Sequence, residues 1–205
     1  MTLIFDMLAE LDATRRAVGP GEGDTVAVSL TRTYDADADD VWDALTNPER
    51  LPRWFSPVTG DLRVGGGYQI QGNAGGEILV CDPPAWLSVT FGGPESILDL
   101  RLTAEGARTT LELGHAVPTA MAGGGAGALY VGPGWDGAVM GLGLYLRGDV
   151  IGDPVEAANS PEVIEFNKGS IDRWTAVVES SGTASPEALA QAREVSIQQF
   201  TVLPD

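Results

Sequence analysis

The stretch WLSVTFGGPESILDLRLTAEGARTTLELGH, residues 86–115, decides the fold class. It contains three runs in which every second residue lies in phase, and glycine-containing turns separate them. The in-phase positions are Leu87, Val89 and Phe91, then Leu98, Leu100 and Leu102, then Leu111, Leu113 and His115. Because alternate side chains of a strand point to opposite faces, the pattern predicts an antiparallel sheet with one buried face and one solvated face.

The pattern continues toward the N-terminus. A strand is predicted at residues 24–34, and shorter strands are predicted at 61–64, 68–71 and 77–81, each followed by glycine or proline. Turns that recur roughly every 8–12 residues are typical of a meander. We therefore expect a single curved antiparallel sheet of about six to seven strands within residues 24–116.

Helical spacing of apolar residues in other parts of the chain predicts several helices beside the sheet, so the expected fold class is α+β. A helix is predicted at residues 2–17, where it packs on the domain or forms a dimer contact. Two short helices follow the first strand, one capped by Asp37 or Asp39 and one starting at Asn47-Pro48. A long helix is predicted at 133–147, and further helices are predicted at 161–180 and 186–200.

The glycines of the last third of the domain are informative. Residues 117–131 are rich in alanine and glycine, and they predict a mobile loop. Gly137, Gly141 and Gly143 lie inside the long helix, where each costs up to about 1 kcal/mol relative to alanine. Such a cost is tolerated where another element comes close or where space stays open. We favour open space, as part of a cavity of a few hundred Å³.

Composition excludes several classes of protein. The formal net charge of the 205 residues is −17, which disfavours binding to nucleic acid or to an anionic membrane. No apolar run reaches the roughly 18 residues that span a bilayer, so no membrane insertion is expected. The single cysteine, Cys81, points to a reducing compartment. The acidic N-terminus does not look like a signal peptide, so we expect a cytoplasmic protein.

Several segments carry a family resemblance. They are residues 34–36 (YDA), 41–51 (VWDALTNPERL), 53–55 (RWF), 60–66 (GDLRVGG), 75–79 (GGEIL), 83–84 (PP) and 132–137 (GPGWDG). Over about residues 24–147, the chain resembles the START-like helix-grip superfamily, the SRPBCC grouping. Within it, the chain is similar to the branch named after the activator of the heat-shock-ninety chaperone ATPase.

The resemblance implies a sheet that grips the long helix, with a cavity between them. Members bind lipids, polyketides or other apolar ligands; some are cyclases or aromatases, and some are co-chaperones. We expect an N-terminal helix at 1–20, a helix-grip domain at 24–150, and a C-terminal helical extension at 155–205 that packs on the domain.

The motifs for cofactors and metals are incomplete. Gly132, Gly134 and Gly137 match a dinucleotide fingerprint formally, but no strand of a βαβ unit precedes them, and Pro133 removes a backbone N–H that phosphate would need. The chain has a single histidine and a single cysteine, which gives no metal-ligand cluster. It also lacks the nucleophile elbow of hydrolases. We expect no cofactor, no metal and no evident catalysis.

The expected site is apolar and aromatic. The residues predicted to bind a ligand are Trp54, Phe55, Tyr68, Phe91, His115, Trp135, Val139 and Met140; core packing alone is the alternative. His115 is interpreted first as a hydrogen-bonded structural residue and second as a polar anchor or an acid–base group. The leading hypothesis is binding of a lipid, an acyl chain or a polyketide-like molecule. The alternatives are a cyclase or dehydratase that uses His115, and a co-chaperone-like module with a protein partner.

Overall fold

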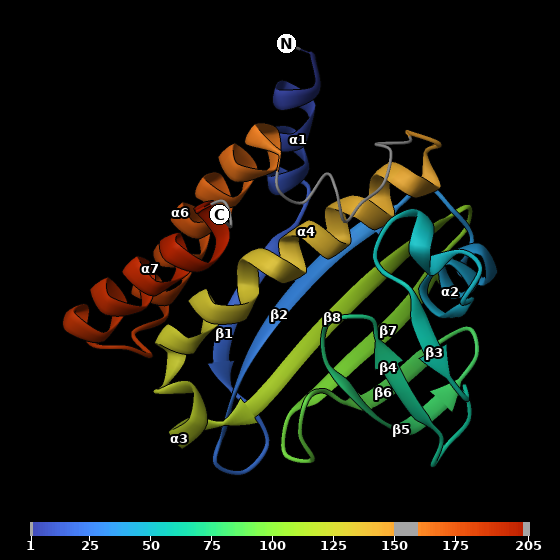
Figure 1. Cartoon of the computed structure of the whole chain (residues 1–205), viewed down its shortest axis with the longest axis horizontal. Coiled ribbons are helices and arrows are strands. Elements are labelled where there is room, and N and C mark those ends of the chain that lie inside the picture. Colours follow the sequence, from blue (N-terminus) through green and yellow to red (C-terminus); the bar gives the residue numbers. More distant parts are fainter. Residues whose placement is uncertain (1, 150–159, 203–205) are drawn as a thin grey trace.

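The computed structural model describes residues 2–149 and 160–202. Over these residues, eight antiparallel strands form one sheet in the order β1-β2-β8-β7-β6-β5-β4-β3 (Figure 1). The strands are β1 (Arg15–Pro20), β2 (Thr25–Tyr34), β3 (Val58–Gly60), β4 (Gly67–Ile70), β5 (Gly75–Asp82), β6 (Trp86–Thr90), β7 (Ile97–Glu105) and β8 (Arg108–Pro118). The predicted meander is confirmed, because β3 to β8 pair in the order in which they follow along the chain.

The long helix α4 (Ala128–Leu146) lies across the concave face of this sheet (Figure 1). The sheet supplies the helix with a buried apolar surface, because the in-phase residues of β7 and β8 face the same side. Leu100 pairs with Leu113, and Leu98 pairs with His115, as the alternation predicted. The hydroxyl of Tyr34 on β2 donates a hydrogen bond to the carbonyl oxygen of Val139 at 3.0 Å, which ties the helix to the sheet. The predicted helix-grip fold is confirmed.

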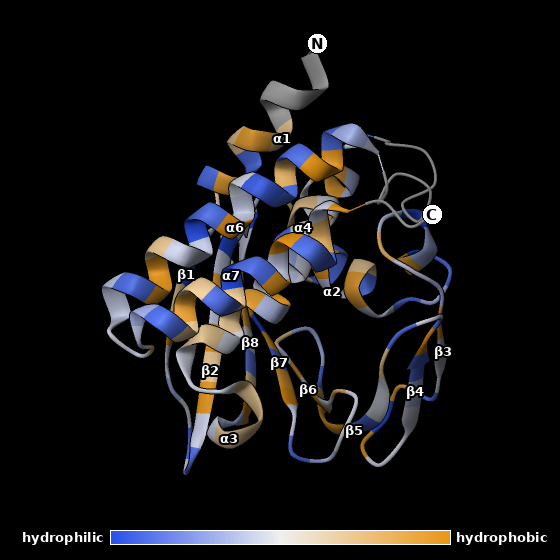
Figure 2. Cartoon of the chain, turned by 60° about the vertical axis from the view of Figure 1, so that its left-hand side comes forward, coloured by the Kyte–Doolittle hydropathy of each residue, from blue (hydrophilic) through white to orange (hydrophobic). Residues whose placement is uncertain are grey.

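Three further helices cover the other side of α4. They are α1 (Thr2–Asp12), α6 (Pro161–Ser181) and α7 (Pro186–Thr201) (Figure 1). Figure 2 shows hydrophilic and hydrophobic residues alternating along α6 and α7, as expected for helices with one buried face. Ser160 and Ser185 cap the starts of α6 and α7, and Gly182 ends α6 with a φ of 66°. The predicted C-terminal helices are confirmed.

The N-terminal helix is shorter than predicted. It ends at Asp12, and residues 15–20 form strand β1 beside β2, with Arg15 opposite Thr31. Residues 15–17 are therefore strand, which the helical prediction over 2–17 got wrong. The reason is tertiary: pairing with β2 gives β1 backbone partners that the local apolar spacing does not reveal. This edge strand also brings the count to eight rather than six to seven.

The segment between β8 and α4 is not a loop. Residues 119–122 form helix α3 (Thr119–Ala122), residues 125–127 form a 3-10 turn, η2 (Gly125–Gly127), and α4 begins five residues before the predicted start. The small residues here are buried: Ala126 and Ala128 are 3% exposed, because neighbouring elements pack closely against them. The prediction of a loop over 117–131 was wrong for this reason.

Of the elements predicted between β2 and β4, the first short helix is confirmed and two others differ. Helix α2 (Ala38–Thr46) has Asp37 as its N-cap, with the side chain accepting from the N–H of Asp40 at 2.9 Å. The second short helix is only the 3-10 turn η1 (Leu51–Arg53). The strand predicted at 61–64 is instead a turn after β3, closed by a hydrogen bond from the N–H of Gly66 to the carbonyl of Arg63.

The division into domains stays a prediction. The boundary expected between the helix-grip domain and the C-terminal extension falls within residues 150–159, which lie outside the described residues. Among residues 2–149 and 160–202, no helix combines the length and the apolarity needed to cross a membrane.

Candidate functional site

A cavity of about 140 Å³ lies between the concave face of the sheet and α4. One wall is α4 itself, which contributes side chains at helical spacing, and the opposite wall is the in-phase face of β5 to β8. The lining residues are Leu45, Thr46, Leu51, Trp54, Phe55, Val58, Leu62, Tyr68, Ile70, Ile78, Leu87, Val89, Phe91, Leu98, Leu100, Leu111, Leu113, Trp135, Ala138, Val139 and Leu142.

The segment from α2 to η1 forms the third side of the cavity. Leu45 and Leu51 flank the turn, and the Trp54 and Phe55 rings lie beside each other with centroids 5.5 Å apart. Leu62, in the turn after β3, is 45% exposed although it also lines the cavity. The wall at this turn therefore reaches the solvent.

The polar atoms of the lining residues point away from the cavity or are already bonded. The indole N–H of Trp54 donates to the carbonyl of Ala44 at 3.1 Å, and the Tyr68 hydroxyl donates to the carbonyl of Thr90 at 2.8 Å. The hydroxyl of Thr46 donates to a carbonyl one helical turn earlier. Burial raises the pKa of Tyr68 to about 12, so this phenol stays protonated at physiological pH.

Charge is missing from the lining. Among the described residues that surround the cavity, none carries an ionisable carboxylate, amine, guanidinium or imidazole. An ion placed in such a site would lose its hydration without gaining a partner, which is very costly. The cavity therefore suits a neutral, apolar guest, held by the removal of its surface from water.

His115 lies behind the cavity wall rather than in it. The indole N–H of Trp135 donates to Nδ1 at 3.1 Å, and Nε2 lies 2.8 Å from the hydroxyl of Ser96. Because an indole nitrogen only donates, Nδ1 must be the unprotonated nitrogen, and the proton of the neutral ring is on Nε2, pointing to Ser96. Burial lowers the pKa of His115 to about 4. The imidazole is thus fixed as a neutral hydrogen-bonded residue, as the first interpretation expected.

The structure brings most of the predicted ligand-binding residues together. Six of them line the cavity: Trp54, Phe55, Tyr68, Phe91, Trp135 and Val139. His115 does not line it, and Met140 lies on the opposite side of α4, in a cluster with Met7, Leu11, Leu144 and Phe166. Met140 follows Val139 directly, and one residue turns an α-helix by about 100°, which takes the Met140 side chain away from the sheet.

Sequence reasoning left out the aliphatic residues of the site. Ile78, Leu98 and Leu111 line the cavity, and the alternation had already placed the last two on the buried face. What the sequence does not show is that this face is incompletely filled by α4. The volume is also smaller than the few hundred Å³ expected.

Two of the three helix glycines are explained by close packing and not by open space. A Cβ at Gly141 would lie 2.9 Å from the carbonyl oxygen of Trp54, and one at Gly143 would lie 2.6 Å from the guanidinium of Arg32. A Cβ at Gly137 would meet nothing within 4 Å. The interpretation as open space was therefore wrong for Gly141 and Gly143, which let other groups approach the helix backbone, whereas Gly137 does border open space.

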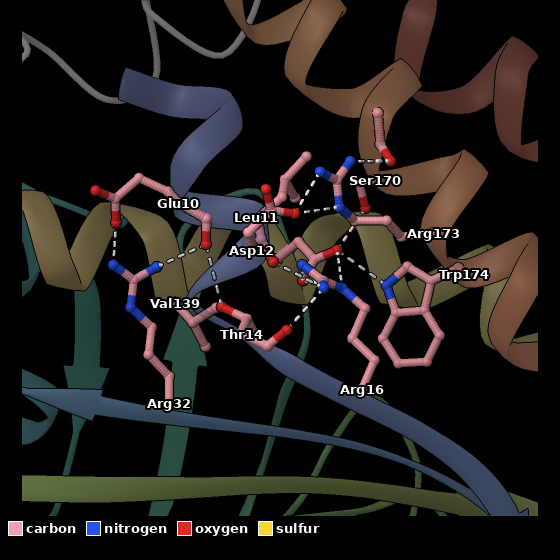
Figure 3. Close-up of polar contacts among 12 residues, drawn as sticks. Glu10, Leu11, Asp12, Thr14, Arg16, Arg32, Val139, Ser170, Arg173 and Trp174 are labelled. Atoms are coloured by element: carbon pink, nitrogen blue, oxygen red, sulfur yellow. Dashed lines mark hydrogen bonds and ion pairs between the residues drawn. The ribbon is translucent and has the colours of Figure 1, made fainter. Parts of the chain in front are cut away.

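A buried polar network fixes α4 from its other side. Arg16 on β1 pairs with Asp136 of α4 at 2.8 Å, and the same carboxylate accepts from the Ser170 hydroxyl and from the indole N–H of Trp174 on α6. Figure 3 shows Arg16, Ser170 and Trp174 converging between α4 and α6. Desolvation raises the pKa of Asp136, although all three partners favour its charged form.

A second ion cluster closes the C-terminal end of α4. Glu10 of α1 pairs with Arg32 of β2 and, at 2.7 Å, with Arg147 just after α4 (Figure 3 for Glu10 and Arg32). Together the two networks fix the position of α4 over the sheet, and hence the width of the cavity. Within the described part of the chain, no group of three or more His, Cys, Asp or Glu residues could hold a metal ion.

Comparisons with known proteins agree with this geometry. The family profile described as activator of Hsp90 ATPase homolog 1-like protein matches residues 35–147. The solution structure of CalU16 from Micromonospora echinospora is 40% identical, covers 82% of this chain and 97% of its own, and superposes with a TM-score of 0.70. The crystal structure of the same protein gives 36% identity, 82% and 99% coverage, and a TM-score of 0.66.

A more distant structure is DynU16, described as a putative protein in the dynemicin biosynthetic locus. It is 26% identical, with 64% of this chain and 49% of DynU16 covered and a TM-score of 0.53. Among curated proteins, none matches the chain at a significant level.

Proposed function

This chain belongs to the family of activator of Hsp90 ATPase homolog 1-like proteins, and from that premise we propose that it binds a neutral, apolar small molecule in the cavity beneath α4. A cytoplasmic setting and the absence of a cofactor are parts of the proposal. So is the assignment of α6 and α7 as an extension that packs on the helix-grip domain.

The observation that carries the proposal is the lining of the cavity. Its polar atoms are engaged elsewhere, as for Trp54 and Tyr68, and its walls are otherwise hydrocarbon. Apolar cavities of about 150 Å³ stay dry and take up molecules of the size of benzene. A guest gains about 25 cal/mol for each Å² of apolar surface that leaves water, and this is the driving force for binding.

Catalysis is disfavoured by the same lining. The one imidazole of the chain is His115, and both of its nitrogens are engaged by Trp135 and Ser96. A general acid or base must reach the reacting atom directly or through one water. The hydrogen bond from Trp135 occupies the only lone pair that could accept a proton, so binding is favoured over a cyclase or dehydratase reaction.

The description of DynU16 supports a small-molecule ligand over a protein partner. That protein is described as a putative protein in the dynemicin biosynthetic locus, and its fold is similar to that of this chain. We extend to this chain only the chemical class, an apolar small molecule, because the cavity itself selects that class.

Naphthalene is a suitable probe, since it is neutral, apolar and close in size to the cavity. Equilibrium dialysis should show saturable binding to the wild-type protein and a loss of more than tenfold in affinity for Ala138→Phe. Ala138 lies on the α4 wall, so a phenyl ring there takes up the volume of the guest. The matched control is Ala190→Phe on the exposed face of α7, which should bind as the wild type does.

The proposal fails if Ala138→Phe binds naphthalene as tightly as the wild type, or if the wild type shows no saturable binding. Far-ultraviolet circular dichroism and a thermal melt of each variant establish that the fold is intact. If the proposal fails while the fold is intact, the co-chaperone-like alternative would be tested next, on the outer face of the sheet.

A further inference from the structure

A second apolar cavity, of about 170 Å³, lies at the other end of the same groove. It is enclosed by the ends of β2 and β8, by α3 and by the first turns of α4, at the end of α4 next to α3 in Figure 1. Its lining residues are Val26, Val28, His115, Val117, Met121, Ala122, Gly127, Ala128, Tyr130 and Val131.

The two cavities are consecutive along the same two elements. On β8, Leu111 and Leu113 line the first cavity, and the next two in-phase residues, His115 and Val117, line the second. On α4, Trp135 belongs to the first cavity, and Val131, one turn earlier, belongs to the second. The sheet and the helix thus form one continuous groove with an interruption in its middle.

Three rings make up that interruption, which we call the partition: Phe91, His115 and Trp135. Their centroids are 5.2 Å apart for Phe91 and Trp135, 5.4 Å for Phe91 and His115, and 5.6 Å for His115 and Trp135. A single neutral hydrogen bond, from the indole of Trp135 to Nδ1, joins its two polar members. Such a bond changes an equilibrium by roughly tenfold when its partners find replacements, so the two rings can separate where the indole N–H is given another acceptor.

Each cavity alone is smaller than the roughly 300 Å³ at which small-molecule sites begin, whereas the two together reach that size. We propose that both cavities form one binding site for an elongated neutral ligand, which is apolar at both ends and passes between Trp135 and His115. This inference rests on the proposed function, and it adds the length and the polarity pattern of the ligand.

The partition also specifies the middle of the ligand. When the rings separate, the indole N–H of Trp135 loses its acceptor in a region that is otherwise apolar, and a buried unsatisfied donor is costly. A ligand with a carbonyl or hydroxyl oxygen at its centre restores that hydrogen bond. The ligand class is therefore a molecule with two apolar ends joined through a neutral acceptor, such as an aromatic ketone.

A matched pair of variants tests the two cavities. Ala138 lines the first cavity and Ala128 lines the second, ten positions apart on α4, so Ala138→Phe and Ala128→Phe make the same change at each. The probes are naphthalene, which fits one cavity, and trans-chalcone, an aromatic ketone with two phenyl ends. Dialysis should show that chalcone affinity falls more than tenfold in both variants, and that Ala128→Phe still binds naphthalene in the first cavity.

The outcomes separate this inference from the proposed function. If Ala128→Phe binds chalcone like the wild type while Ala138→Phe does not, the second cavity is not part of the site and the inference is overturned. If Ala138→Phe leaves naphthalene binding unchanged, it is the proposed function that fails. Val131→Phe fills the same second cavity and replaces Ala128→Phe if that variant does not fold.

The central acceptor is tested with 1,3-diphenylpropene, which resembles chalcone but has no carbonyl. The wild type should bind chalcone several-fold more tightly than this hydrocarbon. In Trp135→Phe the ring stays but the N–H is gone, so the preference should disappear. A preference that persists in Trp135→Phe would overturn the assignment of the indole N–H as the donor.

Discussion

Lowering the pH from 7 to 5.5 should destabilise the folded protein, and His115 should make a separable contribution to this loss. The imidazole is 6% exposed, and its Nδ1 accepts the hydrogen bond from Trp135. Protonation would abolish that acceptor and place a charge in an apolar region. Burial accordingly lowers the pKa of His115 from 6.5 to about 4.

The magnitude follows from proton linkage. Between pH 6.5 and about pH 4, the unfolded chain binds a proton at His115 that the folded protein does not bind, so stability falls as the pH falls. The contribution is fully present above pH 6.5, and the slope approaches about 1.4 kcal/mol per pH unit within this window. From pH 7 to pH 5.5, the free energy of unfolding should therefore decrease by about 1 kcal/mol.

Urea denaturation at pH 7 and 5.5 measures this change, and His115→Gln isolates it from the carboxylates. The glutamine amide can donate to Ser96 but does not titrate, so the stability difference between wild type and variant should shrink by about 1 kcal/mol at the lower pH. Since His115 is the only histidine, its imidazole resonances need no assignment by mutagenesis. A nuclear magnetic resonance titration with a midpoint near 6.5, or an Nδ1–H tautomer at pH 7, would refute the reasoning.

Two further predictions concern what holds α4 in place. Asp136→Asn removes the charged partner of the buried Arg16, and in urea denaturation it should lower the free energy of unfolding by about 3–5 kcal/mol. Asp43→Asn, in a half-exposed ion pair, should lower it by at most about 1 kcal/mol. Equal losses in the two variants would contradict the burial argument. In thermal melts, Gly137→Ala should raise stability by up to about 1 kcal/mol, since the new Cβ meets nothing within 4 Å. Gly141→Ala should lower stability, because its Cβ would lie 2.9 Å from the carbonyl oxygen of Trp54. If both alanine substitutions stabilised the protein, the segment that contains Trp54 would have to move freely.

The sequence identified the groups that surround the site without showing the space between them. Six of the eight predicted ligand-binding residues line the cavity, because aromatic residues on the buried faces of several elements must meet around the long helix. Met140 and His115 do not line this cavity, for different reasons. The rotation of α4 about its own axis turns the Met140 side chain away from the sheet, and His115 lies behind Trp135, from whose indole N–H it accepts a hydrogen bond.

The sequence by itself determined strands β2 and β4 to β8, their succession as an antiparallel meander, and the face of the sheet that is buried. These features follow from local periodicity, because residues two apart in a strand share a face and glycine turns mark where the chain reverses. The caps of α2 and α7 were predictable for the same reason, since a cap is a contact within a few residues.

Only the tertiary structure decided where the chain departs from local preference. Residues 15–17 are strand because β2 offers them backbone partners, and residues 128–132 are the first part of α4, which packs on α6 and α7. Gly132 leaves room for the ring of Trp174, and Asp136 meets Arg16 from 120 residues away. Such pairs fix the position of α4 and so the two cavities, and no local pattern encodes them, because their partners are brought together only when the whole chain packs.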